Sequence, residues 1–199
     1  MKQNQEEEEM VDSSYFMNTS TTGAATGAFE YPKLYSFPPF FTLQPVAETR
    51  DKQLEAWTAL VLSYARSKNV FAFDPATFSP FENKAIERSL NETERNAVVD
   101  YLLKKGACER VGDGTKKVHV LWKSIKEWET LLVEWAHRTG RREDVMTVDE
   151  LCTSEEFSDE DFHGMAPSLL LKILKNLEKG KHVMLFQGSD GDDLGIKFL

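Results

Sequence analysis

A helix that ends at a glycine and continues directly into a β-hairpin is predicted twice in this chain, and this repeat limits the folds available to it. The two stretches read LLKKGACERVGDG, which begins at Leu102, and NLEKGKHVMLFQGSDG, which begins at Asn176. Glycine is common just beyond the last turn of a helix, and glycine beside aspartate favours a tight hairpin turn. The repeat lies in architecture more than in identity, and it predicts two modules built in the same order.

The first module opens with a predicted helix, Thr49–Lys68, whose apolar stripe at helical spacing is formed by Leu54, Trp57, Val61, Tyr64 and Ala65. Asn91 with Glu94 three residues later is typical of a capping box, and it marks the start of a third helix that ends at Gly106. The remaining predicted elements are a strand at Val70–Phe73, a short second helix near Asn83–Arg88, and hairpin strands at Ala107–Val111 and Val118–Trp122.

The second module repeats this order. Its first helix is predicted from an apolar stripe formed by Ile125, Trp128, Leu132, Trp135 and Ala136. A short strand turns into a second helix within Met146–Leu151, and a third helix lies within Ala166–Lys179 and ends at Gly180. The last two strands are HVMLF and GIKFL, which flank a wing with the sequence GSDGDDL.

The order helix, strand, helix, helix, hairpin is that of a winged helix, a variant of the helix-turn-helix. We therefore predict an α+β fold with two tandem winged-helix domains and a disordered acidic N-terminal tail. The predicted divisions are a tail at residues 1–30, a proline-rich and aromatic docking segment at residues 31–48, and winged helices at residues 49–123 and 124–199.

The acidic charge is concentrated in the predicted tail. The chain has a formal charge of -9, and residues 1–30 contain one Lys against six acids, net -5, which leaves -4 for the rest. Low hydrophobicity and small polar residues do not bury enough apolar surface to offset the entropy of ordering. The folded part is therefore only mildly acidic.

Charge also argues against DNA binding, the first function that a winged helix suggests. The third-helix region of the first module, residues 91–105, has three acids against three bases, and the wing of the second module is acidic. Contacts to phosphates depend on clustered Lys and Arg. A DNA-binding regulator remains the alternative to a protein-binding subunit.

No catalytic, metal or cofactor motif is evident. The four histidines and two cysteines lack metal-ligand spacing, and Cys108 and Cys152 are expected to be free thiols in a reducing compartment. No apolar run approaches the roughly 20 residues of a membrane-spanning helix, so a cytosolic protein without catalysis or cofactor is expected. An acidic run is expected to be a solvated loop or a surface that steers a basic partner helix, with candidate residues Glu155, Glu156, Asp159, Glu160 and Asp161.

The segment YSFPPFFTLQP, Tyr35–Pro45, places three prolines and four aromatic rings ahead of the first helix. A pre-extended polyproline segment loses little entropy when it binds, and its phenylalanines are suited to apolar pockets of a partner. The other interpretation is that the segment folds back on its own module. Phe40 is expected to act mainly in docking, and Phe41, which lies closer to the first helix, in both. The candidate docking residues are Phe37, Pro38, Pro39, Phe40 and Phe41.

The combination of FPPFFTLQP, TRDKQLEAWTALVLSYAR, VDELCTSEE, DFHGM and the terminal GIKFL resembles the small subunit of the ESCRT-II complex, in the vacuolar protein-sorting family. The resemblance covers Tyr31–Leu199. The chain departs from the family in its acidic tail before Phe29 and in the GRRED turn, Gly140–Asp144.

The resemblance implies tandem winged helices in a Y-shaped complex, in which two copies of this subunit join one copy each of two larger subunits. It implies that the Pro-Pro-aromatic motif docks into hydrophobic grooves of the larger subunits. The second winged helix would bind the N-terminal helix of an ESCRT-III subunit and nucleate ESCRT-III on endosomes. The implied function is non-catalytic scaffolding in multivesicular-body sorting of ubiquitinated cargo, by a cytoplasmic protein recruited to the endosomal membrane.

Overall fold

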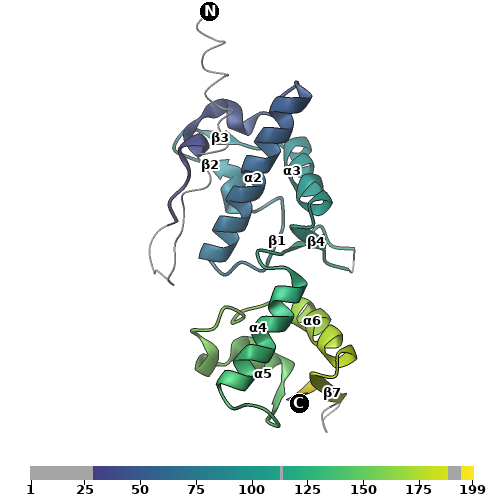
Figure 1. The fold of residues 1–199 in the computed structure, drawn as a ribbon. Helices are drawn as coiled ribbons and strands as arrows, with labels where there is room; N and C mark the ends of the chain where they lie inside the picture. Colours follow the sequence, from purple (N-terminus) through teal and green to yellow (C-terminus); the bar gives the residue numbers. More distant parts are fainter. Residues whose placement is uncertain (1–28, 113, 188–193) are drawn as a thin grey trace, which may run out of the picture. The chain divides into compact units, whose positions relative to one another are not determined.

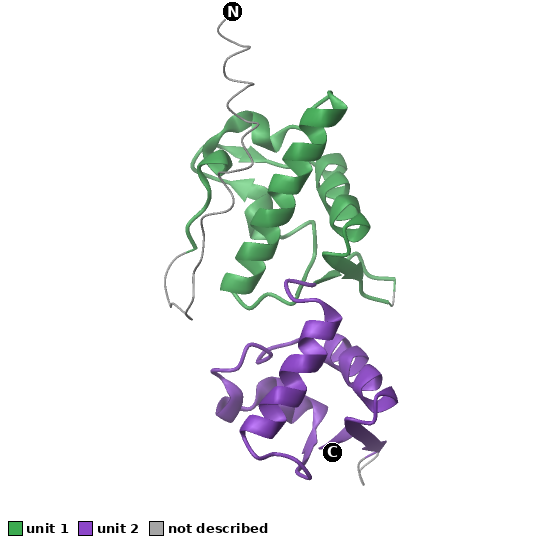
Figure 2. Cartoon of the chain, in the orientation of Figure 1, with its two compact units in different colours: residues 1–120 green, residues 121–199 purple. Residues whose placement is uncertain are grey.

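The chain divides into two compact units, unit 1 (Met1–Val120) and unit 2 (Leu121–Leu199), in a computed structural model that describes residues 29–112, 114–187 and 194–199 (Figures 1 and 2). The division lies close to the boundary expected after residue 123. The predicted tail lies outside the described residues except for Phe29 and Glu30, as does most of the second wing.

Unit 1 follows the predicted element order of a winged helix apart from the second helix. Its elements are η3 (Lys33–Ser36), η4 (Pro38–Phe41), α2 (Ala47–Ser67), β1 (Ala72–Phe73), η5 (Ser79–Phe81), β2 (Glu82–Asn83), β3 (Arg88–Ser89), α3 (Glu92–Lys104), β4 (Cys108–Arg110) and β5 (Val118–Val120). The strands β1, β5 and β4 form an antiparallel sheet in that order. The helices α2 and α3 lie side by side (Figure 1).

The short second helix predicted near Asn83–Arg88 is wrong. That region forms the antiparallel pair β2 and β3, joined by a turn in which Glu87 has a positive φ of 54°. The Asn83 side chain competes with a helix, because its Oδ1 accepts the backbone N–H of Ala85 and its Nδ2 donates to the carbonyl of Tyr35, 2.7 Å away. A long-range contact therefore overrides the local helical tendency.

Unit 2 follows the predicted order throughout its described residues. Its elements are α4 (Ile125–Arg138), β6 (Val145–Thr147), α5 (Val148–Thr153), η6 (Glu155–Phe157), α6 (Pro167–Lys179), β7 (Val183–Gln187) and β8 (Leu194–Phe198). The antiparallel sheet has the order β6, β8, β7. Capping boxes begin α4 at Ser124 and α5 at Thr147, so the helix starts are set by local sequence.

Each unit has an aromatic core of its own. In unit 1, Trp57 is 1% exposed and its ring lies edge-on to Phe81 at 5.7 Å. In unit 2, Trp135 makes edge contacts to Phe157, Phe162 and Phe198 at 5.0 to 5.8 Å between ring centroids. The DFHGM string therefore has a structural role, since Phe162 is fully buried and Gly164 has a φ of +77°.

Candidate functional site

The Pro-Pro-aromatic segment forms two successive 3₁₀ turns, η3 and η4, instead of the extended polyproline segment expected from the sequence. Pro38 and Pro39 occupy the first positions of η4, where their missing N–H groups cost no hydrogen bond. The Thr42 N–H donates to the carbonyl of Pro39 at 3.1 Å and closes the turn. The segment is thus preformed, but as a compact turn.

The two phenylalanines after the prolines lie in the core of unit 1. The ring of Phe40 is stacked on Trp57 with a centroid distance of 4.3 Å and an interplanar angle of 7°, and it is 1% exposed. Phe41 lies edge-on to the same indole at 5.4 Å and is 2% exposed. The expectation that Phe40 is free for a partner is therefore wrong in this conformation, because the indole provides an internal apolar surface for its ring.

Tyr35 connects the segment to the β2 strand. Its hydroxyl donates to the carbonyl of Glu82 at 2.7 Å, and its own carbonyl accepts from Asn83. Burial, followed by the proximity of Tyr31, raises the pKa of the Tyr35 hydroxyl well above its ordinary value. Tyr35 therefore remains a neutral donor that holds the start of the segment.

Among the five predicted docking residues, Pro38 and Pro39 are exposed and form a short ridge, with Phe37 half-buried beside it. We call these three residues the proline ridge. The structure therefore separates the five predicted docking residues into an outward group, the proline ridge, and an inward group, Phe40 and Phe41. Sequence spacing did not distinguish the two groups, since all five are apolar and adjacent.

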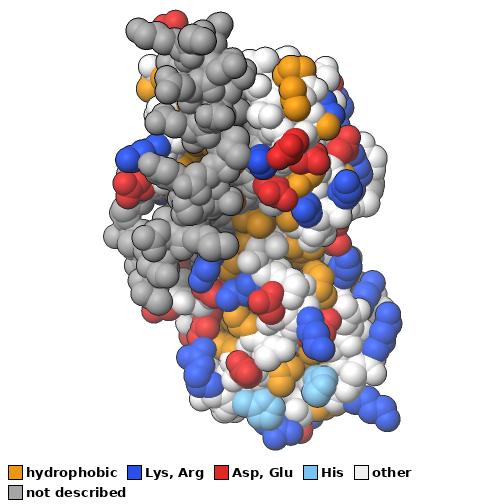
Figure 3. Space-filling model, turned by 45° about the horizontal axis from the view of Figure 1, so that its top comes forward, with side chains coloured by type: hydrophobic (Ala, Val, Ile, Leu, Met, Phe, Trp, Pro, Cys, Tyr) orange, Lys and Arg blue, Asp and Glu red, His pale blue; other side chains and the backbone are white. Residues whose placement is uncertain are grey.

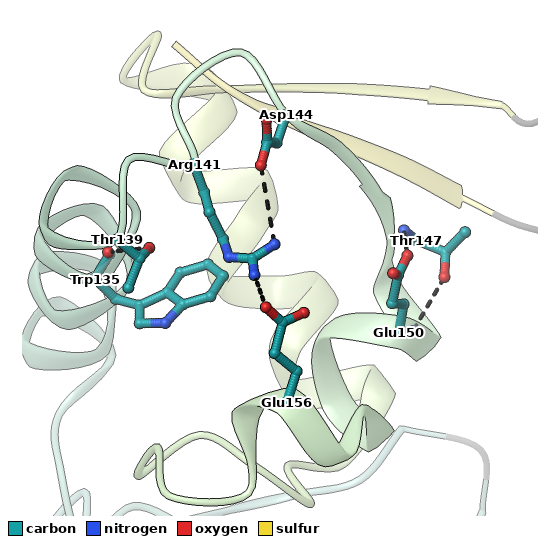
Figure 4. Close-up of polar contacts among 7 residues, drawn as sticks. All are labelled: Trp135, Thr139, Arg141, Asp144, Thr147, Glu150 and Glu156. Atoms are coloured by element: carbon teal, nitrogen blue, oxygen red, sulfur yellow. Dashed lines mark hydrogen bonds and ion pairs between the residues drawn. The ribbon is translucent and has the colours of Figure 1, made fainter.

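The acidic run of unit 2 is largely occupied by ion pairs within the unit. Figure 4 shows the Arg141 guanidinium between Glu156 and Asp144. The same guanidinium lies over the Phe157 ring, 4.9 Å from its centroid. Glu160 accepts from Arg138 at 2.9 Å, and Asp161 pairs with Lys123 at 2.8 Å.

Among the five predicted steering acids, Glu155 and Asp159 are exposed and form no ion pair with the described residues. They contribute the main uncompensated charge of the run. The GRRED turn, which departs from the family pattern, supplies Arg141 and therefore has a structural role.

An exposed apolar face on the unit 2 sheet was missed by the sequence analysis. Val145, Met184 and Phe186 are 63%, 50% and 37% exposed, and we call them the outer sheet face. Val145 and Met184 both lie opposite Lys197, while Phe186 lies opposite Gly195. A Cβ at Gly195 would be 2.4 Å from the Phe186 ring, so the glycine permits that ring to lie flat on the sheet. The signal in the sequence was HVMLF, because its consecutive apolar residues place apolar side chains on both faces of the strand.

Both cysteines are free, as predicted, and both are buried. Burial raises the pKa of Cys108 to about 12 and that of Cys152 to about 11, so neither is a thiolate at neutral pH. Within the described ranges no group of His, Cys, Asp or Glu is arranged to hold a metal ion. No helix in the same ranges is long and apolar enough to span a bilayer.

Taken together, two winged helices with a proline ridge and an exposed apolar sheet face define a tandem winged-helix protein suited to binding other proteins. A family model described as ESCRT-II complex subunit matches residues 34–166. The chain belongs to this family of ESCRT-II complex subunits.

Relatives of similar length support this assignment. Vacuolar protein sorting-associated protein 25 of Arabidopsis thaliana is 34% identical over 171 residues, which cover 85% of this chain and 96% of the relative. The Danio rerio protein of that name is 38% identical over 174 residues, which cover 86% of this chain and 99% of the relative.

Solved structures agree with the fold. The crystal structure of subunit VPS25 of the endosomal trafficking complex ESCRT-II superimposes with a TM-score of 0.75 at 27% identity, covering 83% of this chain and 97% of that one. A chain in the crystal structure of the endosomal complex ESCRT-II (VPS22/VPS25/VPS36) superimposes with a TM-score of 0.72 at 27% identity. The match covers 82% of this chain and 96% of that one. The α+β fold with two tandem winged helices is thereby confirmed.

Proposed function

We propose that the chain is a non-catalytic subunit of an ESCRT-II complex, and that it binds two larger subunits through its Pro-Pro-aromatic segment. The observation that carries the proposal is the proline ridge, which leaves apolar rings exposed on a preformed turn. A rigid apolar projection loses little entropy on binding. The complex of a similar chain with VPS22 and VPS36 supports two partners of this kind.

The same proposal assigns each docking residue a part. Phe37, Pro38 and Pro39 contact the partner, while Phe40 and Phe41 anchor the turn from inside. The complex acts in endosomal multivesicular-body sorting of ubiquitinated cargo, and the subunit is cytoplasmic and recruited to the endosomal membrane through it. The names of the relatives, which refer to vacuolar protein sorting and endosomal trafficking, support this setting.

Unit 2 is proposed to recruit ESCRT-III by binding the N-terminal helix of one of its subunits. An amphipathic helix needs an apolar surface, and the exposed Met184 and Phe186, on the strand that follows α6, offer one. Of the acidic run, Glu155 and Asp159 are the residues left to steer a basic helix, because Glu156, Glu160 and Asp161 are paired internally.

The docking role is tested by replacing Pro38 and Pro39 together with Ala. Loss of the two rings from the ridge is expected to weaken binding to the purified complex of the two larger subunits by at least about tenfold, as for a central anchor. The melting temperature of the free chain is expected to change little, since both rings are exposed. Pro45→Ala, another exposed proline, is the matched control.

Unchanged affinity in the double variant, measured by calorimetry, would remove the proline ridge from the interface. It would leave the family assignment intact, because that assignment rests on the sequence matches.

A winged-helix DNA-binding regulator is the second candidate. The observation that favours it is the run of lysines on α6, at positions Lys172, Lys175 and Lys179. The face drawn in Figure 3 instead intersperses Lys and Arg with Asp and Glu, which does not favour a phosphate backbone. A gel-shift titration separates the two functions, since DNA binding requires a retarded band whose affinity falls steeply with salt.

A further inference from the structure

One buried polar side chain, Gln53 on α2, makes contacts that bear directly on the proline ridge. It is 4% exposed, although glutamine is usually found at the surface. A buried amide without partners would be destabilising, so its hydrogen bonds show what it does in the fold. All of those described go to the segment that precedes α2.

Gln53 uses both ends of its amide on the backbone of that segment. Its Nε2 lies 2.9 Å from the carbonyl oxygens of Phe40 and Thr42 and 3.4 Å from that of Pro39. Its Oε1 accepts the N–H of Gln44 at 3.1 Å. We call this set the Gln53 clamp.

The clamp holds the carbonyl side of the turn against α2. Backbone carbonyls at the end of a short 3₁₀ helix have no partners within the helix and must find them elsewhere. Gln53 draws the carbonyls of Phe40 and Thr42 toward α2, and Trp57 Nε1 donates to the Phe40 carbonyl as well, at 3.1 Å. With the carbonyl side turned inward, Pro38 and Pro39 remain exposed.

A second side chain, the carboxylate of Glu94 on α3, strengthens the same arrangement. Glu94 Oε1 accepts the N–H of Leu43 at 3.3 Å, and its Oε2 accepts the N–H of Asn91 at 2.7 Å. Glu94 is itself 9% exposed. The turn is therefore held from two helices of the folded unit, which a free peptide lacks.

We infer that Gln53 is a positioning residue for partner binding, and that the larger subunits recognise the proline ridge as a preformed turn of folded unit 1 rather than as an extended peptide. The inference rests on the proposed docking function of the ridge. It adds that the Gln53 clamp sets the orientation of the pyrrolidine rings. Binding then depends on a residue that touches no partner.

The first arm of the test compares the folded chain with a synthetic peptide of residues 35–45. Binding of each to the purified complex of the two larger subunits is measured by calorimetry at one temperature and salt concentration. The peptide is expected to bind at least about a hundredfold more weakly, because it must order its backbone on binding. A peptide that binds as tightly as the folded chain overturns the inference.

The second arm replaces Gln53 with Met, which preserves volume and removes the hydrogen bonds. Affinity is expected to fall about tenfold at a temperature where circular dichroism shows the variant fully folded. Hydrogen exchange at the Thr42 and Gln44 amides is expected to accelerate, while exchange in the centre of α2 is unchanged. Lys52→Met, a neighbouring position with an exposed side chain, is the matched control.

Normal affinity of a folded Gln53→Met variant, with Pro38→Ala/Pro39→Ala still impaired, overturns the positioning role alone. If the double proline variant also binds normally, the proposed docking function fails first. If Gln53→Met does not fold, the peptide arm still decides whether recognition requires the preformed turn.

Discussion

At the scale of single residues, Trp57 explains why the Pro-Pro-aromatic segment belongs to unit 1. Its indole contacts Phe40 face to face and Phe41 edge to face, and its Nε1 donates to the Phe40 carbonyl at 3.1 Å. An aromatic side chain with a satisfied polar atom contributes both burial and direction. One tryptophan thus fixes both the rings and the backbone of the turn.

Replacing Phe40 with Ala is expected to lower the free energy of unfolding of unit 1 by about 3 to 5 kcal/mol, the usual cost of removing a fully buried ring. The stacked contact on Trp57 and the 1% exposure are the reasons. Urea denaturation followed by tryptophan fluorescence measures the change. Phe37→Ala, at a half-buried position, is the control and is expected to cost much less.

A Phe40→Ala variant that unfolds at the same urea concentration as the parent would contradict the burial of the ring. It would restore the interpretation in which Phe40 is held free for a partner.

At the scale of elements, α3, α4 and α5 begin at capping residues of the local sequence, and the turns depend on contacts from elsewhere. Asn91 accepts the Glu94 N–H at 3.0 Å, and Glu94 in turn accepts the Asn91 N–H at 2.7 Å. The same Glu94 carboxylate reaches Leu43 at 3.3 Å. The cap of α3 is therefore also a support for the segment that follows η4.

Removing the cap with Asn91→Ala is expected to destabilise unit 1 by about 1 kcal/mol, the typical value for an N-cap. Asn91→Asp keeps a side-chain acceptor and is expected to remain near the parent. Thermal melting by circular dichroism measures both. Asn96→Ala, an exposed position inside α3, provides the comparison, and a loss as large as that of Asn91→Ala would show that the cap is not the cause.

At the scale of the whole molecule, the chain builds two cores where one larger core was possible. The Trp57 cluster belongs to unit 1, and the Trp135 cluster belongs to unit 2. Each unit is of a size at which a single hydrophobic core is sufficient but not large. Two distinct surfaces follow, the proline ridge on unit 1 and the outer sheet face on unit 2.

Deleting residues 1–28 is expected to leave the melting temperature and partner binding unchanged, since their composition offers little apolar area to bury. The deletion ends before Phe29, whose ring contacts Tyr31 at 4.9 Å and Tyr64 at 5.2 Å. Phe29→Ala in the full chain is the comparison and is expected to lower the melting temperature. A drop of several degrees on deletion alone would show that residues 1–28 pack on the fold.

The sequence by itself determined the α+β class, the order of elements in unit 2, the free thiols and the start of α3. These features depend on local periodicity and on capping pairs such as Asn91 with Glu94, which act over a few residues. The family resemblance was also readable, because FPPFFTLQP and GIKFL are distinctive strings in this order.

Only the tertiary structure decided the conformation of the β2–β3 region and the direction of each ring in FPPFF. Asn83 finds its partner 48 positions away at Tyr35, and Gln53 and Trp57 hold the Phe40 carbonyl from a different element. Local propensity carries no information about such partners. A run of adjacent apolar residues exposes some members and buries others according to which neighbours the fold places beside them, because burial depends on the three-dimensional surroundings of each side chain.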